Sequence, residues 1–397
     1  MARRLNLALI PFVIGTIVGL IVLWPAHQKH RSVRALGTPA QLVNATVTQV
    51  DTGPCQQQGA GRCSTVYVTV TSGADHGHSA ILPEVALGPG VAELHRGDKV
   101  VLGRTVDPTD GHVDYYFDDY QRRTPMLLLA ILFAVLVVVV GRWRGVAALV
   151  GLLLTGFVLL RFIIPSILDG NSPVSVALVG SAAIIFVVIY VAHGFSPKTT
   201  TALLGTLASL ALTAGLAVLF VAATHLTGLS SDETTSLQST LGSVPLQGLI
   251  LAGIIIGSLG VLNDVTVTQA SSVWEIHDAN TTRSARELYR AGMRVGRDHI
   301  ASTVYTLVLA YAGASLPLLI LFSLSNQRFV NVLTGDLVGQ EIVRALVGSI
   351  GLVASVPLTT ALAAAVVRSS VDGVSERSER TDEQSAPRSE APPKAAR

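Results

Sequence analysis

The stretch Pro125-Met-Leu-Leu-Leu-Ala-Ile-Leu-Phe-Ala-Val-Leu-Val-Val-Val-Val-Gly141 decides the fold class of this chain. It contains no charged residue, and it lacks the alternation of apolar and polar positions that marks a half-buried strand. As a helix, its 17 residues are about long enough to cross a hydrocarbon core of ~30 Å. A helix also satisfies its own backbone hydrogen bonds in lipid. The stretch therefore predicts a transmembrane helix.

Seven further apolar runs of similar length follow the same pattern. They are Leu7–Trp24, Gly145–Ile164, Val174–Ala192, Thr201–Ala223, Pro245–Leu262, Ser302–Leu324 and Ile342–Val367. The chain is only 14% charged, whereas a soluble domain is about one quarter charged. We therefore expect a membrane all-α protein, a polytopic bundle of eight transmembrane helices in a lipid bilayer, with residues 125–368 forming seven of them.

The first run could belong to a cleaved signal peptide or to an uncleaved anchor, because Arg3 and Arg4 form a basic start. Its apolar stretch is long for a signal peptide, and Trp24-Pro25-Ala26-His27 offers a poor cleavage site. We therefore expect residues 1–24 to remain as a signal-anchor transmembrane helix.

The distribution of Lys and Arg predicts the orientation. By parity, one set of helix ends carries the positive charge: Arg142, Arg144, Lys198, the arginines of residues 283–297, and Arg368. The opposite loops, 165–173 and 225–244, contain neither Lys nor Arg. Basic residues that flank segment 25–124 lie on the opposite side by this parity, against the rule, but long domains are translocated largely regardless of charge. We expect both termini in the cytoplasm. The use of Arg in place of Lys indicates a GC-rich bacterium and thus a bacterial plasma membrane.

Residues 25–124 differ in kind from the rest. Apolar and polar residues alternate in Val43–Val50 and Val66–Val70, and turn signals such as Ser72-Gly73 and Asp110-Gly111 separate such stretches. Short strands at this spacing predict a small extracytoplasmic β-barrel or sandwich of the OB type.

The two cysteines, Cys55 and Cys63, flank a loop rich in Gln and Gly within this segment. In an oxidising compartment they would form a disulfide. A metal pair is the alternative, but no further Cys or well-spaced His accompanies them. We expect the disulfide and no metal site.

The most informative polar segment is Gly257–Ile276. If the sixth helix continues through it, Asp264, Thr268, Ser271 and Glu275 share one face, with Asn263 beside them. One interpretation is a stripe lining a cytoplasm-facing cavity, in which the carboxylates bind a cation or relay a proton. The other is that the helix leaves the membrane near Asn263 and ends in solvent.

Arg161 lies inside the third run, near its outer end. Its side chain could extend to the interface, or it could pair with a carboxylate or an anionic substrate.

Five arginines follow one face of a helix expected at residues 281–299. They are Arg283, Arg286, Arg290, Arg294 and Arg297. A basic amphipathic helix of this kind binds anionic lipid head groups at the cytoplasmic face. A docking surface for a cytoplasmic partner and a site for an anionic substrate are the alternatives.

Several classes of function are not indicated. The chain lacks the phosphate-loop, nucleophile-elbow and His-Glu-x-x-His motifs, so we expect neither an enzyme nor a cofactor. A net charge of +2 does not suggest nucleic acid as a partner. The tail, residues 369–397, is rich in Ser, Glu, Arg and Pro and is expected to be a disordered cytoplasmic segment.

Three motifs resemble the YibE/F-like family of bacterial membrane proteins. They are Gly260-Val-Leu-Asn-Asp-Val265, Ala270-Ser-Ser-Val-Trp-Glu-Ile276 and Gly292-Met-Arg-Val-Gly-Arg-Asp298. The resemblance runs from about residue 40 to the last apolar run, although Asn263 stands where such proteins often have Met. It implies an all-helical membrane bundle with an extracytoplasmic β-domain, and it supplies no substrate.

These patterns favour a secondary transporter or permease for an unknown small solute or ion, with Asp264 and Glu275 in its path. The alternative is a membrane scaffold or sensor that does not transport, whose β-domain binds a ligand or partner. A homo-oligomer is compatible with both.

Overall fold

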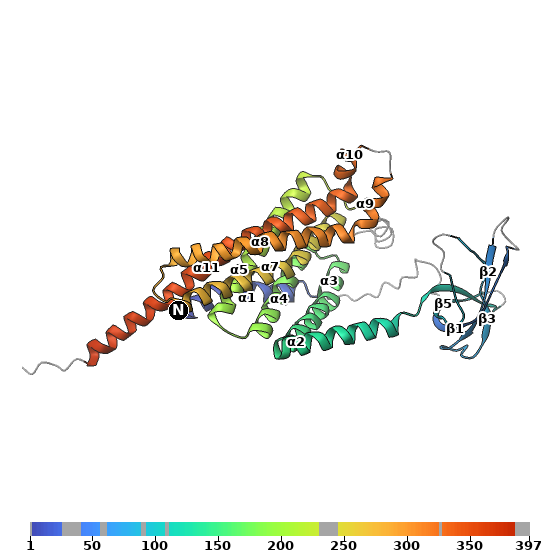
Figure 1. Ribbon diagram of the computed structural model, residues 1–397, viewed down its shortest axis with the longest axis horizontal. Coiled ribbons are helices and arrows are strands. Elements are labelled where there is room, and N and C mark those ends of the chain that lie inside the picture. The colour runs from blue at the N-terminus through green and yellow to red at the C-terminus, as the bar shows by residue number, and fades with distance from the viewer. Residues whose placement is uncertain are drawn as a thin grey trace, which may run out of the picture. The chain divides into compact units, whose positions relative to one another are not determined.

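The computed structural model describes residues 2–25, 41–55, 62–88, 93–107, 111–229, 245–324 and 328–385. The chain divides into two compact units (Figure 1). One, here the membrane unit, comprises residues 1–28 and 141–397, and the other, here the β unit, comprises residues 29–140.

All eight apolar runs are helical. The helices are α1 (Ala2–Val22), α2 (Arg123–Val158), the π-helix η2 (Leu159–Ile163), α3 (Ile164–Leu168), α4 (Pro173–His193), α5 (Pro197–Ala223), α7 (Leu246–Ala279), α8 (Ala285–Ala314), α9 (Leu316–Ser323), α10 (Phe329–Thr334) and α11 (Asp336–Ser385).

The eight expected spans are not all separate helices. Within the described residues, five helices are long and apolar enough to span a membrane: Arg123–Leu168, α4, α5, α7 and Asp336–Arg368. The pair α8 and α9, bent by 64°, makes a sixth if it is one span. The remaining differences are two. The first run forms a shorter apolar helix, Leu7–Val22, and the second and third runs join in one 46-residue stretch. Arg142, at φ 52° and ψ −131°, interrupts that stretch.

Helices α5 and α11 pack antiparallel at the centre of the membrane unit. Glycine on each helix leaves space for threonine on the other: a Cβ at Gly205 would lie 2.4 Å from Thr359 Oγ1, and one at Gly351 would lie 2.0 Å from Thr213 Oγ1. Both threonines are fully buried. Small residues at such positions let membrane helices approach closely.

The same nine-residue pattern produces both halves of this contact. Gly205-Thr-Leu-Ala-Ser-Leu-Ala-Leu-Thr213 in α5 and Gly351-Leu-Val-Ala-Ser-Val-Pro-Leu-Thr359 in α11 are identical at five of nine positions. Because the helices run in opposite directions, glycine of one copy meets threonine of the other at both ends. The contact therefore has a local two-fold symmetry.

Polar contacts near the helix termini define two ends of the membrane unit. At one, the Asp336 end, Asp336 accepts hydrogen bonds from Thr227 N and Oγ1, both at 3.1 Å. Ser166 Oγ donates to the Leu23 carbonyl at 2.7 Å, as expected if residues after the first and third runs share a side. At the other, the Lys198 end, Lys198 Nζ lies 3.8 Å from Glu275 Oε1.

Two boundaries differ from expectation. The basic segment 281–299 is not a separate helix but the first half of α8, which continues to Ala314. Helix α11 continues to Ser385, so the tail expected to be disordered from Ser369 is helical for much of its length. Extending an existing helix needs no new nucleus, and Glu and Arg are good helix formers. Residues 386–397 lie outside the described residues.

The strands of the β unit form one antiparallel sheet. Its strands are β1 (Gln41–Pro54), β2 (Arg62–Val70), β3 (Ser79–Ile81), β4 (Val85–Ala86), β5 (Lys99–Val106) and β6 (Val113–Tyr120). Their order is β3-β2-β1-β5-β6, with β4 also pairing with β2. Alternate residues of the predicted strands are buried, Val66, Val68 and Val70 among them. Among the described strands these pairings form an open sheet, so the OB-type barrel stays a prediction.

Cys55 and Cys63 form a disulfide beside the β1–β2 pair, with Cα atoms 4.9 Å apart. Because Gly53 pairs with Cys63 across the two strands, the disulfide joins the strand ends at the mouth of the hairpin loop.

Candidate functional site

A cavity of about 290 Å³ opens at the Lys198 end of the membrane unit. Basic and hydroxyl side chains from four helices and one turn surround it. Its lining residues are Arg144, Ala192, His193, Ser196, Lys198, Thr199, Ala202, Val267 and Ser271. The cavity therefore brings Arg144 of α2 together with His193 and Lys198, which flank the turn between α4 and α5.

The turn between α4 and α5 positions two of these groups. Helix α4 ends at His193 because Gly194 adopts φ 71°, a conformation that favours glycine. Ser196 then caps α5: its Oγ accepts a hydrogen bond from Thr199 N at 3.0 Å, and Pro197 occupies the first turn. The positive end of α5 therefore faces the cavity beside Lys198.

Helix α7 contributes two of the residues predicted for the site. Ser271 lines the cavity. Glu275, one turn further on, forms an ion pair with Lys198, and its side chain remains 76% exposed. An ion pair this exposed is weak, so Lys198 remains available to another anion.

The other predicted α7 residues do not reach the cavity. Asp264 is exposed, and no side chain of another helix binds its carboxylate among the described residues. Thr268 is half-buried, and its carbonyl accepts a hydrogen bond from Ser272 Oγ. Asn263 Oδ1 is buried without a hydrogen-bond partner within the described part of the chain. The expected cavity around Asp264 is therefore not observed.

The opposite, inward face of α7 carries polar residues that the sequence analysis missed. Gln269 is 2% exposed, and its Nε2 donates to Gly292 O of α8 and to Thr360 Oγ1 of α11, both at 2.8 Å. Thr266 Oγ1 lies 2.6 Å from Thr206 Oγ1 of α5. The signal was present in the sequence, since Thr266 and Gln269 lie at the spacing of the apolar Leu262, Val265 and Val273.

A second missed group is an ion pair within α11, near the Asp336 end. Arg344 Nη1 lies 2.9 Å from Glu341 Oε1, and both side chains are more than two-thirds buried. Arg344 Nε is buried without a partner among the described residues. Gly253 of α7 lies beside this arginine, as a Cβ there would lie 3.8 Å from Nη2, an ordinary van der Waals contact. Ionisable groups inside a membrane bundle usually have a function.

Neither predicted arginine group enters the cavity. Arg161 lies in η2 and is exposed, and its guanidinium has no ion-pair partner among the described residues. Arg286, Arg290, Arg294 and Arg297 line the exposed side of α8. Arg283 precedes the N-cap, Ser284. The buried side of the helix, which includes Leu288, contacts a cluster that includes Val273 and Ala363. The apolar face of this basic helix is thus covered by protein.

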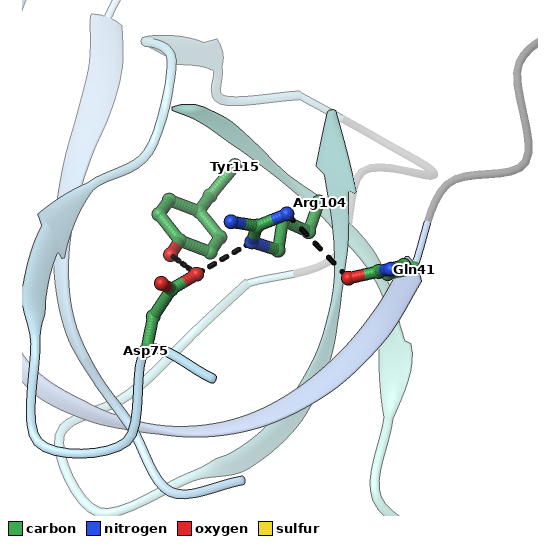
Figure 2. Close-up of polar contacts among 4 residues, drawn as sticks. All are labelled: Gln41, Asp75, Arg104 and Tyr115. Atoms are coloured by element: carbon green, nitrogen blue, oxygen red, sulfur yellow. Dashed lines mark hydrogen bonds and ion pairs between the residues drawn. The ribbon is translucent and has the colours of Figure 1, made fainter. Parts of the chain in front are cut away.

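The β unit has its own polar cluster (Figure 2). Asp75 Oδ2 accepts hydrogen bonds from Arg104 Nε at 2.5 Å and from Tyr115 OH at 2.7 Å, while Arg104 Nη1 donates to Gln41 Oε1 at 3.5 Å. The hydrogen bond from Arg104 lowers the pKa of Asp75 and, in return, raises the pKa of Arg104. Burial is the main reason that the pKa of Tyr115 is raised. The cluster fastens the β2–β3 turn to β5 and β6.

Helices of this length and hydropathy, built around a buried core, define a multi-pass membrane protein. The sequence matches the YibE/F-like protein family over residues 129–369, more than half of the chain, and the protein belongs to that family. The match begins after the strands of the β unit, later than the resemblance at residue 40 suggested. No curated protein and no solved structure matches the chain.

Proposed function

We propose that this protein is a secondary transporter whose solute path runs along helices α5, α7 and α11. The observation that carries the proposal is the repeated Gly-x₃-Ser-x₃-Thr pattern of α5 and α11, which pack antiparallel with local two-fold symmetry. Repeats of inverted topology, with the substrate site at their interface, are typical of secondary transporters.

Polar groups towards both ends of the membrane unit support a path along these helices. The basic cavity lies at the Lys198 end, and the buried Thr266 and Gln269 occupy the same turns of α7 as the cavity-lining Val267 and Ser271. The Arg344–Glu341 pair lies towards the Asp336 end. Burying such groups in a membrane bundle costs free energy, so their presence there indicates a role in transport or in packing. Ser271 and Glu275 keep the role expected for α7, and Asp264 is not needed for it.

We infer that the Lys198 end faces the cytoplasm of a bacterial plasma membrane. Arg144, Lys198 and the arginines of α8 gather at this end, and the positive-inside rule favours that orientation. The 46-residue stretch Arg123–Leu168 would be ~69 Å long as a straight helix, more than twice the hydrocarbon core, so we propose that it crosses twice, with the break at Arg142 between the crossings. If α1 and the α8–α9 pair also cross once each, the chain crosses eight times, which places both termini in the cytoplasm.

Flux through the purified protein tests the proposal. Liposomes with and without protein are compared for uptake of a panel of small anions, cations and neutral solutes, each with and without a proton gradient. Uptake above the level of protein-free liposomes for at least one solute is expected. Absence of uptake for every solute in the panel would contradict transport.

A cysteine pair asks whether the two repeats must move. In the double variant Gly205→Cys, Thr359→Cys, a Cβ at 205 would lie 3.2 Å from the Cβ at 359. Disulfides need about 3.5–4.5 Å, so a small outward shift of the helices brings the pair into range. Oxidation is expected to stop uptake and a reductant to restore it. The wild-type protein with the same reductant controls for reduction of Cys55–Cys63. Full uptake by the oxidised double variant would exclude relative movement of α5 and α11.

A sensor is the second candidate, favoured by one observation in the β unit. A cavity of about 590 Å³ opens there, lined in part by Thr48, Gln49, Ser64, His95 and Arg96. Its size suits a small ligand. If the protein is a sensor, adding the ligand should protect β1 amides from hydrogen exchange while liposome uptake stays at background.

A further inference from the structure

We propose that the basic cavity at the Lys198 end binds a phosphate group, either as inorganic phosphate or as the head group of a phosphate-bearing lipid. Binding follows from the cavity alone. That the phosphate group is also the part of the solute recognised during transport rests on the proposed function.

The chemistry of the lining selects an anion. Arg144 of α2 and Lys198 at the start of α5 bring two positive charges to one cavity, and His193 of α4 adds an imidazole. A guanidinium offers a fork of N–H donors that matches phosphate oxygens, and an ammonium adds a compact charge. No acidic residue is among the described residues that line the cavity.

The remaining lining groups suit a tetrahedral oxyanion with several acceptor atoms. Ser271 adds a hydroxyl group, the hydroxyls of Ser196 and Thr199 lie 2.8 Å apart and hydrogen-bond each other, and the first turn of α5 presents the positive end of its dipole. A volume of about 290 Å³ is at the low end for small-molecule sites, and a water molecule occupies about 30 Å³. The cavity thus has room for a small oxyanion and part of its hydration shell.

Glu275 supplies an exchangeable counter-ion. Its carboxylate lies 3.8 Å from Lys198 Nζ, and it is the more exposed partner, at 76% against 36% for Lys198. An arriving phosphate group can therefore displace Glu275 into solvent without unfolding the helix end. Glu275 should compete with the ligand, so its removal should strengthen binding.

The test measures binding of inorganic phosphate to the full-length protein in detergent by titration calorimetry, with chloride as the comparison anion. Lys198→Ala should weaken phosphate binding by at least about tenfold, because a charge-assisted hydrogen bond is lost. Lys198→Arg should retain most of it. Glu275→Gln should tighten binding by about twofold to fivefold, the range of an exposed ion pair. Asp298→Asn, which removes an exposed carboxylate from α8, is the matched control and should change little.

A lipid arm separates the two sources of the phosphate group. The same titrations are repeated in nanodiscs of phosphatidylcholine alone and of phosphatidylcholine with phosphatidic acid. Competition by phosphatidic acid, abolished in Lys198→Ala, assigns the site to a head group, and its absence assigns the site to free phosphate. The proposal is overturned if neither phosphate nor phosphatidic acid binds detectably. It is also overturned if their affinities are the same in Lys198→Ala and Glu275→Gln as in the wild type.

Failure of this site is distinguishable from failure of the transport function. Phosphate binding without uptake of any solute contradicts transport and leaves the site in place. Uptake of a cation or neutral solute by a protein that binds no phosphate contradicts the site alone. If Lys198→Ala does not fold, the gain expected for Glu275→Gln still decides, because a damaged protein does not bind more tightly.

Discussion

Replacing Gly351 by alanine perturbs the closest approach between α5 and α11. A Cβ there would lie 2.0 Å from Thr213 Oγ1 and 3.1 Å from Thr213 Cβ. Thr213 cannot move aside easily, because it is fully buried and its Oγ1 donates to Ser209 O at 2.8 Å. A β-branched side chain in a helix also has few alternative rotamers. The helices must therefore separate.

The expected cost combines two opposing contributions. Overpacking a buried contact costs about 1–3 kcal/mol, or more when backbone must shift. Alanine recovers up to about 1 kcal/mol through its helix propensity relative to glycine. The clash here involves a stiff, hydrogen-bonded side chain, so we expect the upper part of the range to apply. Gly351→Ala should thus lower the free energy of unfolding by about 1–2 kcal/mol net.

Denaturant unfolding in mixed micelles, followed by far-UV circular dichroism, gives this free energy. Thr213→Ala removes both Oγ1 and Cγ2, so the double variant Thr213→Ala, Gly351→Ala should be more stable than the sum of the single effects predicts, with a coupling of at least about 1 kcal/mol. Gly215→Ala, also in α5, is the control, because a Cβ at this position meets nothing within 4 Å. If Gly351→Ala behaves like Gly215→Ala, or if Thr213→Ala gives no rescue, the argument for reciprocal packing fails.

Three further perturbations test other parts of the structure. Gln269→Leu should destabilise the membrane unit by about 1–3 kcal/mol in the same unfolding assay, because it removes hydrogen bonds to α8 and α11, whereas Ser272→Ala should change stability by less than about 0.5 kcal/mol. Asp75→Asn should lower the unfolding temperature of the β unit near neutral pH. Because the pKa of Asp75 is lowered in the folded protein, the stability advantage of the wild type should persist above about pH 4 and vanish as the pH falls through the folded pKa. Calorimetry of both full-length proteins can follow this. An impermeant thiol reagent should label a cysteine introduced at Ser79 in intact cells but not one introduced at Thr281, and the reverse pattern would invert the proposed orientation.

The helical fold could be predicted because lipid leaves few choices. A run such as Pro125–Gly141 must satisfy its backbone internally, and all eight runs are indeed helical. Their division into separate spans was less predictable. Arg142 interrupts one long helix by a local change of φ and ψ, and α9 follows α8 at a sharp bend. Hydropathy reports how apolar a run is, but it does not report where the backbone turns.

The repeat between α5 and α11 shows a different limit. Its residues are common in membrane helices, and glycine, serine and threonine at four-residue spacing are easily taken as general packing. Two facts give the pattern meaning: the helices are antiparallel, and Gly205 meets Thr359 just as Gly351 meets Thr213. Neither the direction nor the pairing of two helices separated by more than a hundred residues follows from either segment alone.

Helix α7 shows why the site was only partly predictable. Its charged stripe has helical spacing, which establishes that Asp264 and Glu275 share a face but not where that face points. In the structure both residues are exposed, and the opposite face, with Thr266 and Gln269, is buried. A buried amide whose hydrogen bonds are satisfied costs less in a membrane bundle than a buried carboxylate, because the amide carries no net charge. The inward polar residues of such a helix are therefore better sought among its uncharged Gln and Thr side chains, and its carboxylates at the ends, where Glu275 can meet Lys198 in reach of water.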